Sequence, residues 1–130
     1  MKSAIILMML LHVLAASYSQ DPASTVIRTV PVEKFKHAMD SLKDEVVIDL
    51  RTPEETGKGK IPGAIEIDFL GAGFESALAG LDKNKPYLLY CAGGVRSGKA
   101  MERMRKLGFR KIYNLESGYN GWVKRKMPVE

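Results

Sequence analysis

The residues best suited to chemistry surround the single cysteine of the chain, Cys91. Cys91 directly follows an apolar run, and its thiolate form would be a strong nucleophile. Gly93 and Gly94 come next, and glycines allow a backbone to curl so that successive N–H groups point inward. Arg96 and the start of a helix predicted from Ser97 would add positive charge. The segment predicts a cysteine nucleophile in an anion-binding loop.

Cysteine and histidine usage excludes several other kinds of site. One cysteine permits no intramolecular disulfide, no Cys-x-x-Cys redox pair and no zinc-ligand spacing, so neither a metal nor a cofactor is expected. A cysteine–histidine hydrolase is disfavoured, because His12 lies in a predicted signal peptide and His37 is expected on the polar surface of a helix. The plain alternative for Cys91 is a buried, inert thiol beside an ordinary glycine turn.

Length and composition are those of one soluble domain. The chain has 130 residues, of which 45% are hydrophobic and 27% charged. The net charge of +5 is modest and spread over many segments, so it favours small anions and predicts no nucleic-acid partner.

Residues 1–19 have the pattern of a secretory signal peptide. Lys2 precedes an apolar stretch, and the small residues Ser17 and Ser19 suit cleavage between Ser19 and Gln20. Residues 20–24 would then be a short leader, and 25–130 the folded domain. The prediction is a periplasmic or secreted protein without stable membrane insertion after cleavage. The alternative is an uncleaved anchor, for which the apolar run is short.

Short apolar runs alternate with helical patterns through the rest of the chain, which predicts an α/β fold with a mostly parallel sheet of five strands flanked by helices. The expected strands are 25–30, 46–49, 64–67, 86–90 and 112–115, and the expected helices are 31–42, 53–55, 74–81, 97–107 and 119–126. Ligands of such sheets bind beyond the carboxyl ends of the strands. Asp49 and Cys91 each end a strand, so both should lie on one rim. Arg51 is expected there too, as a support that pairs with Glu54 or Glu55.

Three sequence blocks together resemble the rhodanese family. The segment 91–97, CAGGVRS, resembles the family's active loop, Cys-x-x-Gly-x-Arg-Ser. The segments 49–55, DLRTPEE, and 60–64, KIPGA, are similar to its Asp-x-Arg…Glu-Glu…His-Ile-Pro-Gly-Ala block. Gly108, Phe109, Leu115, Gly118 and Trp122 match its C-terminal pattern. The similarity covers about residues 25–129.

The resemblance implies a three-layer rhodanese-like sandwich and a sulfurtransferase activity. Cys91 would take sulfane sulfur from a small anionic donor, thiosulfate or a persulfide, and pass it to cyanide or a thiol. The backbone N–H groups of Ala92, Gly93, Gly94, Val95 and Arg96 would hold the resulting persulfide. The protein would act as a monomer.

Departures from the family pattern affect the expected donor more than the nucleophile. Lys60 replaces the usual histidine, Thr56 a common aromatic residue and Ser117 a glycine. The loop has no charge before Arg96, whereas members that favour thiosulfate often have basic residues there, so thiosulfate is a doubtful physiological donor.

Two rival functions stay open at this point. One is a sulfur carrier or partner-binding domain without turnover. The other is a cysteine phosphatase or arsenate reductase, although those enzymes have one residue more between cysteine and arginine than the four that separate Cys91 from Arg96.

Overall fold

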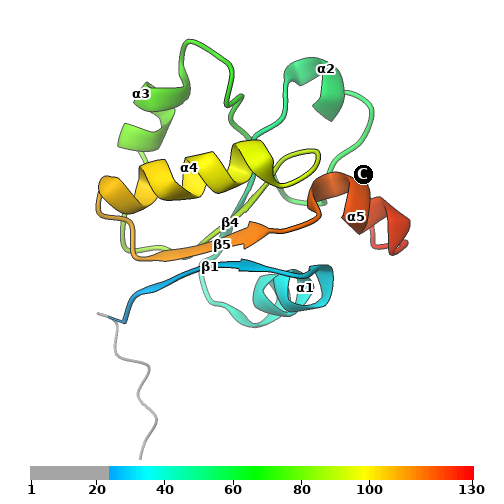
Figure 1. Ribbon diagram of the computed structural model, residues 1–130, viewed down its shortest axis with the longest axis horizontal. Coiled ribbons are helices and arrows are strands. Elements are labelled where there is room, and N and C mark those ends of the chain that lie inside the picture. The colour runs from blue at the N-terminus through cyan, green and yellow to red at the C-terminus, as the bar shows by residue number, and fades with distance from the viewer. Residues whose placement is uncertain (1–23) are drawn as a thin grey trace, which may run out of the picture.

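The computed structural model describes residues 24–130 and has a parallel five-stranded sheet at its centre (Figure 1). The strands lie in the order β1-β5-β4-β2-β3. Their bounds are β1 Val26–Val30, β2 Val46–Asp49, β3 Ile65–Glu66, β4 Tyr87–Tyr90 and β5 Lys111–Leu115. The helices are α1 Val32–Ser41, α2 Pro53–Thr56, α3 Phe74–Ala79, α4 Val95–Lys106 and α5 Gly118–Lys124. The expected α/β class and parallel sheet are confirmed.

Helices cover both faces of the sheet and make three layers. In Figure 1, α1 lies on one side of the strands, and α3 and α4 lie on the other. Helix α5 lies at the end of the sheet, and its Trp122 packs against Phe35 of α1. Successive residues of a strand point to opposite faces. Leu88 and Tyr90 therefore pack in the core that contains Phe35 of α1 and Trp122 of α5. Cys91 packs in the core under α3 and α4.

Helix α4 begins at Val95, two residues earlier than the hydrophobic pattern predicts. Gly94 precedes it with a φ of 94°, a left-handed conformation that glycine adopts without strain. The N–H of Gly98 donates to the carbonyl oxygen of Gly94 at 3.0 Å and closes the first turn. Arg96 and Ser97 thus belong to the first turn of α4, immediately beside Cys91.

The other helices and strands follow the expected order, with shifted ends. Strand β3 has only two residues, both exposed, because it lies at the edge of the sheet. The expected signal peptide and its cleavage point fall outside residues 24–130. Within that range, no helix is long and apolar enough to cross a membrane.

Candidate active site

Cys91 lies at the carboxyl end of β4, at the base of the loop that leads into α4. Its sulfur accepts three hydrogen bonds: from the N–H of Gly94 at 3.2 Å, from the N–H of Ser97 at 3.4 Å and from the hydroxyl of Ser97 at 3.3 Å. These donors surround the sulfur as an anion-binding loop does. The hydroxyl of Ser97 was not among the predicted site residues.

These donors change the acidity of the thiol. Burial by itself raises the pKa of Cys91, because a thiolate is poorly solvated there. Hydrogen bonds from the hydroxyl and amide of Ser97 and from the amides of Gly94 and Gly93 outweigh burial, and the net pKa is lowered. The site therefore favours the thiolate, which is the nucleophilic form.

The carbonyl groups of the loop are held away from the sulfur by α5. The oxygen of Cys91 accepts the N–H of Tyr119 at 2.8 Å, and the oxygen of Ala92 accepts the N–H of Asn120 at 3.1 Å. Gly118 makes this approach possible, since a Cβ there would lie 2.4 Å from the oxygen of Ala92. With their carbonyls fixed on α5, the loop peptides can turn N–H groups toward Cys91.

Arg96 does not present a free positive charge to the thiol. Its guanidinium makes a two-point ion pair with Glu55, with both N–O distances at 2.8 Å. Glu55 also accepts hydrogen bonds from the backbone N–H and hydroxyl of Thr52, and it completes a capping box at the start of α2. The hydrogen bonds from Arg96 lower the pKa of Glu55 to about 2. The carboxylate of Glu55 therefore balances the charge of Arg96 at neutral and mildly acidic pH.

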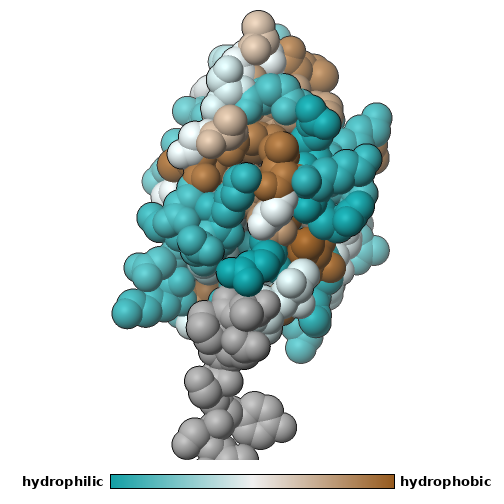
Figure 2. All heavy atoms as spheres, turned by 90° about the vertical axis from the view of Figure 1, so that its left-hand side faces the viewer, coloured by the Kyte–Doolittle hydropathy of each residue, from teal (hydrophilic) through white to brown (hydrophobic). Residues whose placement is uncertain are grey.

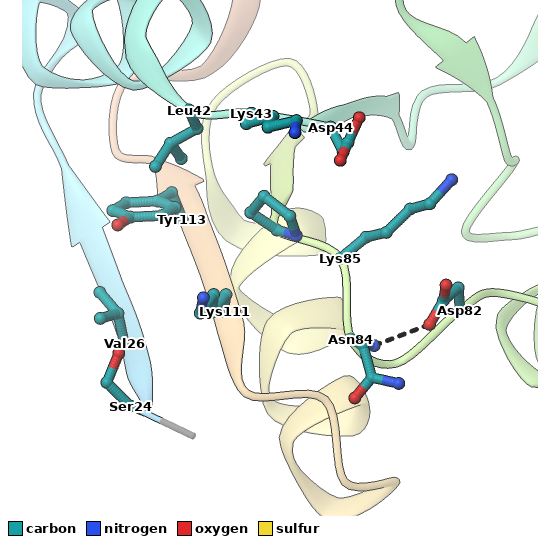
Figure 3. Close-up of a pocket in the computed structure, with 11 residues that line it drawn as sticks. Ser24, Val26, Leu42, Lys43, Asp44, Asp82, Asn84, Lys85, Lys111 and Tyr113 are labelled. Atoms are coloured by element: carbon teal, nitrogen blue, oxygen red, sulfur yellow. Dashed lines mark hydrogen bonds between the residues drawn. The ribbon is translucent and has the colours of Figure 1, made fainter. Parts of the chain in front are cut away.

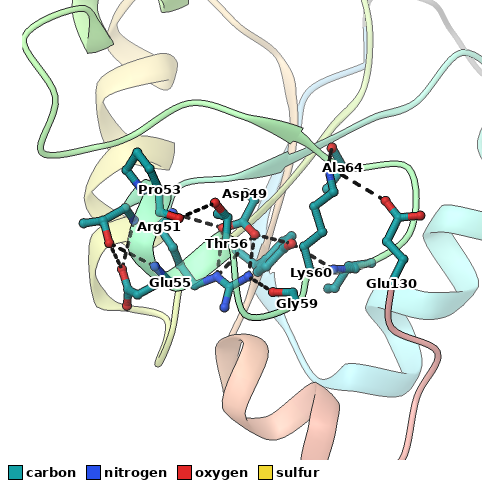
Figure 4. Close-up of polar contacts among 12 residues, drawn as sticks. Asp49, Arg51, Pro53, Glu55, Thr56, Gly59, Lys60, Ala64 and Glu130 are labelled. Carbon is teal, nitrogen blue, oxygen red and sulfur yellow. Dashed lines mark hydrogen bonds and ion pairs between the residues drawn. The ribbon is translucent and has the colours of Figure 1, made fainter.

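Asp49 and Arg51 form a buried ion pair (Figure 4), and Tyr90 joins them in a second cluster. Asp49 accepts hydrogen bonds from Nη2 of Arg51 at 2.7 Å and from the hydroxyl of Tyr90 at 2.5 Å. Arg51 also donates to the oxygen of Gly59 and lies over the ring of Tyr119, 3.9 Å from its centroid. The expected structural salt bridge of Arg51 is present, but its partner is Asp49 and not Glu54 or Glu55.

The two clusters share a rim but not a face of the sheet. Asp49 and Cys91 both end their strands at the carboxyl edge, as the sequence predicts. Asp49 pairs in register with Tyr90 and bonds to its hydroxyl, whereas Cys91 is the next residue and points to the opposite face. Asp49 and Arg51 therefore support the rim from the other face of the sheet, and within residues 24–130 neither forms a hydrogen bond with the sulfur.

Access to the sulfur is narrow. Cys91 is 1% exposed, while Gly93 and Val95 at the tip of the loop are exposed. A hollow of about 400 Å³ adjoins the loop at Ala92. Its other lining residues are Arg51, Glu54, Glu55, Lys58, Tyr119 and Asn120. This hollow offers room for a small molecule next to the loop.

A wider hollow of about 690 Å³ lies at the opposite end of the sheet (Figure 3). It is lined at the amino ends of the strands by residues that include Lys43, Lys85, Lys111 and Tyr113. Figure 2 faces this end and shows apolar atoms between hydrophilic side chains. The wider hollow is lined by none of the predicted site residues. Size alone does not identify the reactive site, because the polarised sulfur lies at the other end.

Three residues that shape the site, Ser97, Glu55 and Gly118, were not predicted as site residues, although each lies in a motif of the sequence. Ser97 is the last residue of the active-loop motif, and Glu55 ends the block 49–55. Gly118 is also a motif residue, and its φ of 61° is left-handed. Their contacts join segments far apart in the chain, so spacing alone could not pair them.

Comparison with known proteins agrees with this geometry. The model of the rhodanese-like domain family matches residues 31–125, and the chain belongs to that family. A sulfurtransferase of Allochromatium vinosum is 23% identical over 104 residues, which are 80% of this chain and 95% of that protein. A Bacillus subtilis protein provisionally named as a sulfur carrier, YrkF, is 34% identical over 106 residues. The match covers 82% of this chain but only 56% of YrkF.

Solved structures show the same fold. A rhodanese-related protein from Thermoplasma volcanium superimposes with a TM-score of 0.69 at 26% sequence identity, over 79% of this chain and 97% of that one. The family and its relatives connect the domain with sulfur transfer in general.

Proposed function

We propose that the protein is a sulfurtransferase that works through a persulfide on Cys91. The observation that carries the proposal is the set of three hydrogen-bond donors on the sulfur, from Gly94 and Ser97. A loop of this kind stabilises a thiolate before reaction and an anionic terminal sulfur after it. Because the thiolate is stabilised before the donor arrives, no separate general base is required.

The reaction has two displacement steps. In the first, the thiolate of Cys91 attacks the outer sulfur of the donor, the sulfur–sulfur bond of the donor breaks, and its remainder leaves with the electron pair. The backbone N–H groups of the loop residues Ala92 to Arg96 hold the terminal sulfur of the persulfide. In the second step a nucleophilic acceptor, cyanide or a thiol, attacks that sulfur and releases the thiolate of Cys91.

The charge pattern supports a persulfide donor over thiosulfate. Glu55 balances the charge of Arg96, and the loop has no other cation before it. A dianion such as thiosulfate therefore meets little net attraction at the loop. The hollow beside Ala92 mixes acidic and basic side chains and suits a reactant that carries groups of both charges, as a glutathione-type persulfide does.

The nucleophile is tested by Cys91→Ser. The wild-type protein should gain the mass of one sulfur atom when incubated with donor, lose it on addition of acceptor, and show ping-pong kinetics. The Cys91→Ser variant should neither gain sulfur nor transfer it to the acceptor, and it should keep the wild-type circular dichroism spectrum. Sulfur transfer by the folded variant would exclude the mechanism.

The donor is tested by Glu55→Gln. The change leaves Arg96 without its counter-charge, so kcat/KM for thiosulfate should rise about threefold or more over the wild-type value. An unchanged or lower value would contradict the assignment of Glu55 as the group that screens Arg96. Lys58→Gln, which alters a charge of the same hollow without touching Arg96, is the matched control.

A sulfur carrier without turnover is the second candidate, because YrkF, at 34% identity, is provisionally named as one. A carrier would load sulfur on Cys91 and release it only to a specific protein. Loading of the sulfur with no release to cyanide or small thiols would favour this candidate.

We also propose that the protein is exported. The support is the signal-like pattern of residues 1–19 with its predicted cut between Ser19 and Gln20. The mature N-terminus, read from the secreted or periplasmic fraction, should begin at Gln20. A protein found only in the cytosol would contradict export.

A further inference from the structure

One buried polar side chain beneath the active loop has no part in the mechanism above. Asn114 lies on β5, is 3% exposed, and pairs in register with Leu89 of the neighbouring strand. It faces the same side of the sheet as Cys91, since a Cβ on Gly98 of α4 would lie 3.4 Å from its nitrogen. An amide in this position lies directly under the first turn of α4.

The nitrogen of Asn114 links the active loop to the edge strand. Nδ2 lies 3.4 Å from the oxygen of Gly94 and 3.2 Å from the hydroxyl oxygen of Thr29 on β1. The oxygen of Gly94 can only accept, so the nitrogen and not the oxygen of Asn114 must face it. The other amide atom, Oδ1, is buried and has no hydrogen-bond partner within residues 24–130.

Gly94 is the residue through which this contact reaches the sulfur. Its N–H donates to Cys91, and its carbonyl oxygen is the atom that Asn114 holds. The carbonyl of Gly94 and the N–H of Val95 belong to the same planar peptide unit and point in opposite directions. A carbonyl that points toward Asn114 therefore directs the N–H of Val95 away from Asn114. Two successive peptide units of the loop therefore depend on the orientation of Gly94.

The space around Gly94 shows that it is held from more than one side. A Cβ there would lie 2.2 Å from the oxygen of Glu116, at the end of β5. Asn114 of β5 and Glu116, which follows β5, thus both lie against Gly94 of the loop. The backbone of Glu116 limits how far Gly94 can move, and the carbonyl oxygen of Gly94 is held both by the N–H of Gly98 at 3.0 Å and by Nδ2 of Asn114 at 3.4 Å.

We propose that Asn114 is a positioning residue that orients the loop amides toward the sulfur of Cys91. The inference rests on the proposed function, in which that sulfur is the reacting atom. The unpartnered Oδ1 supports it. A buried carbonyl without a partner lowers stability, so the position is poorly explained as a purely structural one. A side chain of similar size without polar atoms would avoid that cost but could not hold Gly94.

The test compares Asn114→Leu with Thr29→Val. Both remove the hydrogen bond between positions 29 and 114, but only Asn114→Leu removes the contact with Gly94. The readouts are the pH dependence of Cys91 alkylation by iodoacetamide and the urea midpoint of unfolding. For Asn114→Leu we expect the thiol pKa to rise, and alkylation at neutral pH to slow by about threefold to tenfold. Thr29→Val should keep the wild-type titration curve.

The outcomes separate this inference from the proposed function. If wild-type protein transfers sulfur but Asn114→Leu keeps the wild-type titration curve, the positioning role is wrong and the proposed function stands. Equal shifts in both variants would assign the effect to the link with Thr29 and would also overturn it. If Asn114→Leu does not fold, Asn114→Ala replaces it with the same expectations. Failure of wild-type protein to load sulfur would instead refute the proposed function.

Discussion

The hydroxyl of Ser97 offers the most direct test of how the loop activates its cysteine. Replacing Ser97 with alanine removes one of the three donors to the sulfur and leaves the two amides in place. A hydrogen bond to a charged acceptor contributes about 1.5–3 kcal/mol. The contact is long, at 3.3 Å, so the lower end of that range applies. One pKa unit corresponds to about 1.4 kcal/mol. We therefore expect Ser97→Ala to raise the thiol pKa by about one unit.

The assay is the rate of alkylation by iodoacetamide measured across pH. Cys91 is the single cysteine of the chain, so the signal has one source. At a pH below both pKa values, the thiolate fraction and the alkylation rate should fall about tenfold. Sulfur loading from a persulfide donor should slow by a similar factor. Ser41→Ala is the matched control, since that hydroxyl bonds to the oxygen of His37 on α1 and should leave the titration unchanged.

A titration curve for Ser97→Ala that superimposes on the wild-type curve would show that this hydroxyl does not stabilise the thiolate. It would mean that the amides of Gly94 and Ser97 alone stabilise the thiolate. Because alanine is a good helix former, a lower reactivity could not be attributed to loss of α4 if the thermal melt is unchanged.

Three further predictions concern stability. Glu55 has a folded pKa of about 2 and an ordinary value of 4.5, so its pair with Arg96 stabilises fully above about pH 4.5 and is lost as pH falls toward 2. With a third of the Glu55 side chain exposed, the contribution is about 1 kcal/mol, and urea midpoints of Glu55→Gln should lack this acid-dependent loss. Gly118→Ala should destabilise by about 3 kcal/mol or more, because its Cβ would overlap the oxygen of Ala92; an unchanged melting temperature would contradict this. Asp49→Asn leaves a buried arginine without its counter-charge and should cost about 3–5 kcal/mol in urea unfolding. It should leave the thiol titration unchanged, since the two clusters lie on opposite faces, and a shifted curve would show that they are coupled.

Several features of the fold were predictable because they depend on local pattern. Apolar runs bounded by turn residues located the five strands to within a few residues, and their alternation with helices predicted the parallel sheet. The rule that ligands lie at the carboxyl ends of strands placed Cys91 and Asp49 on the same rim. The start of α4 was placed two residues late, because Gly94 begins the helix through its left-handed backbone and not through hydrophobic spacing.

The sequence by itself predicted the candidate nucleophile and the kind of loop around it, since Cys91, two glycines and the start of a helix follow one another within a few residues. The tertiary structure decided which groups face one another. It paired Arg96 with Glu55, and Arg51 with Asp49, although all four are charged residues of the same rim. The physical reason is that strand pleating sends Asp49 and Cys91 to opposite faces, while β5 and α5 bring distant groups under the loop. Such contacts depend on packing between segments, and spacing along one chain does not specify them.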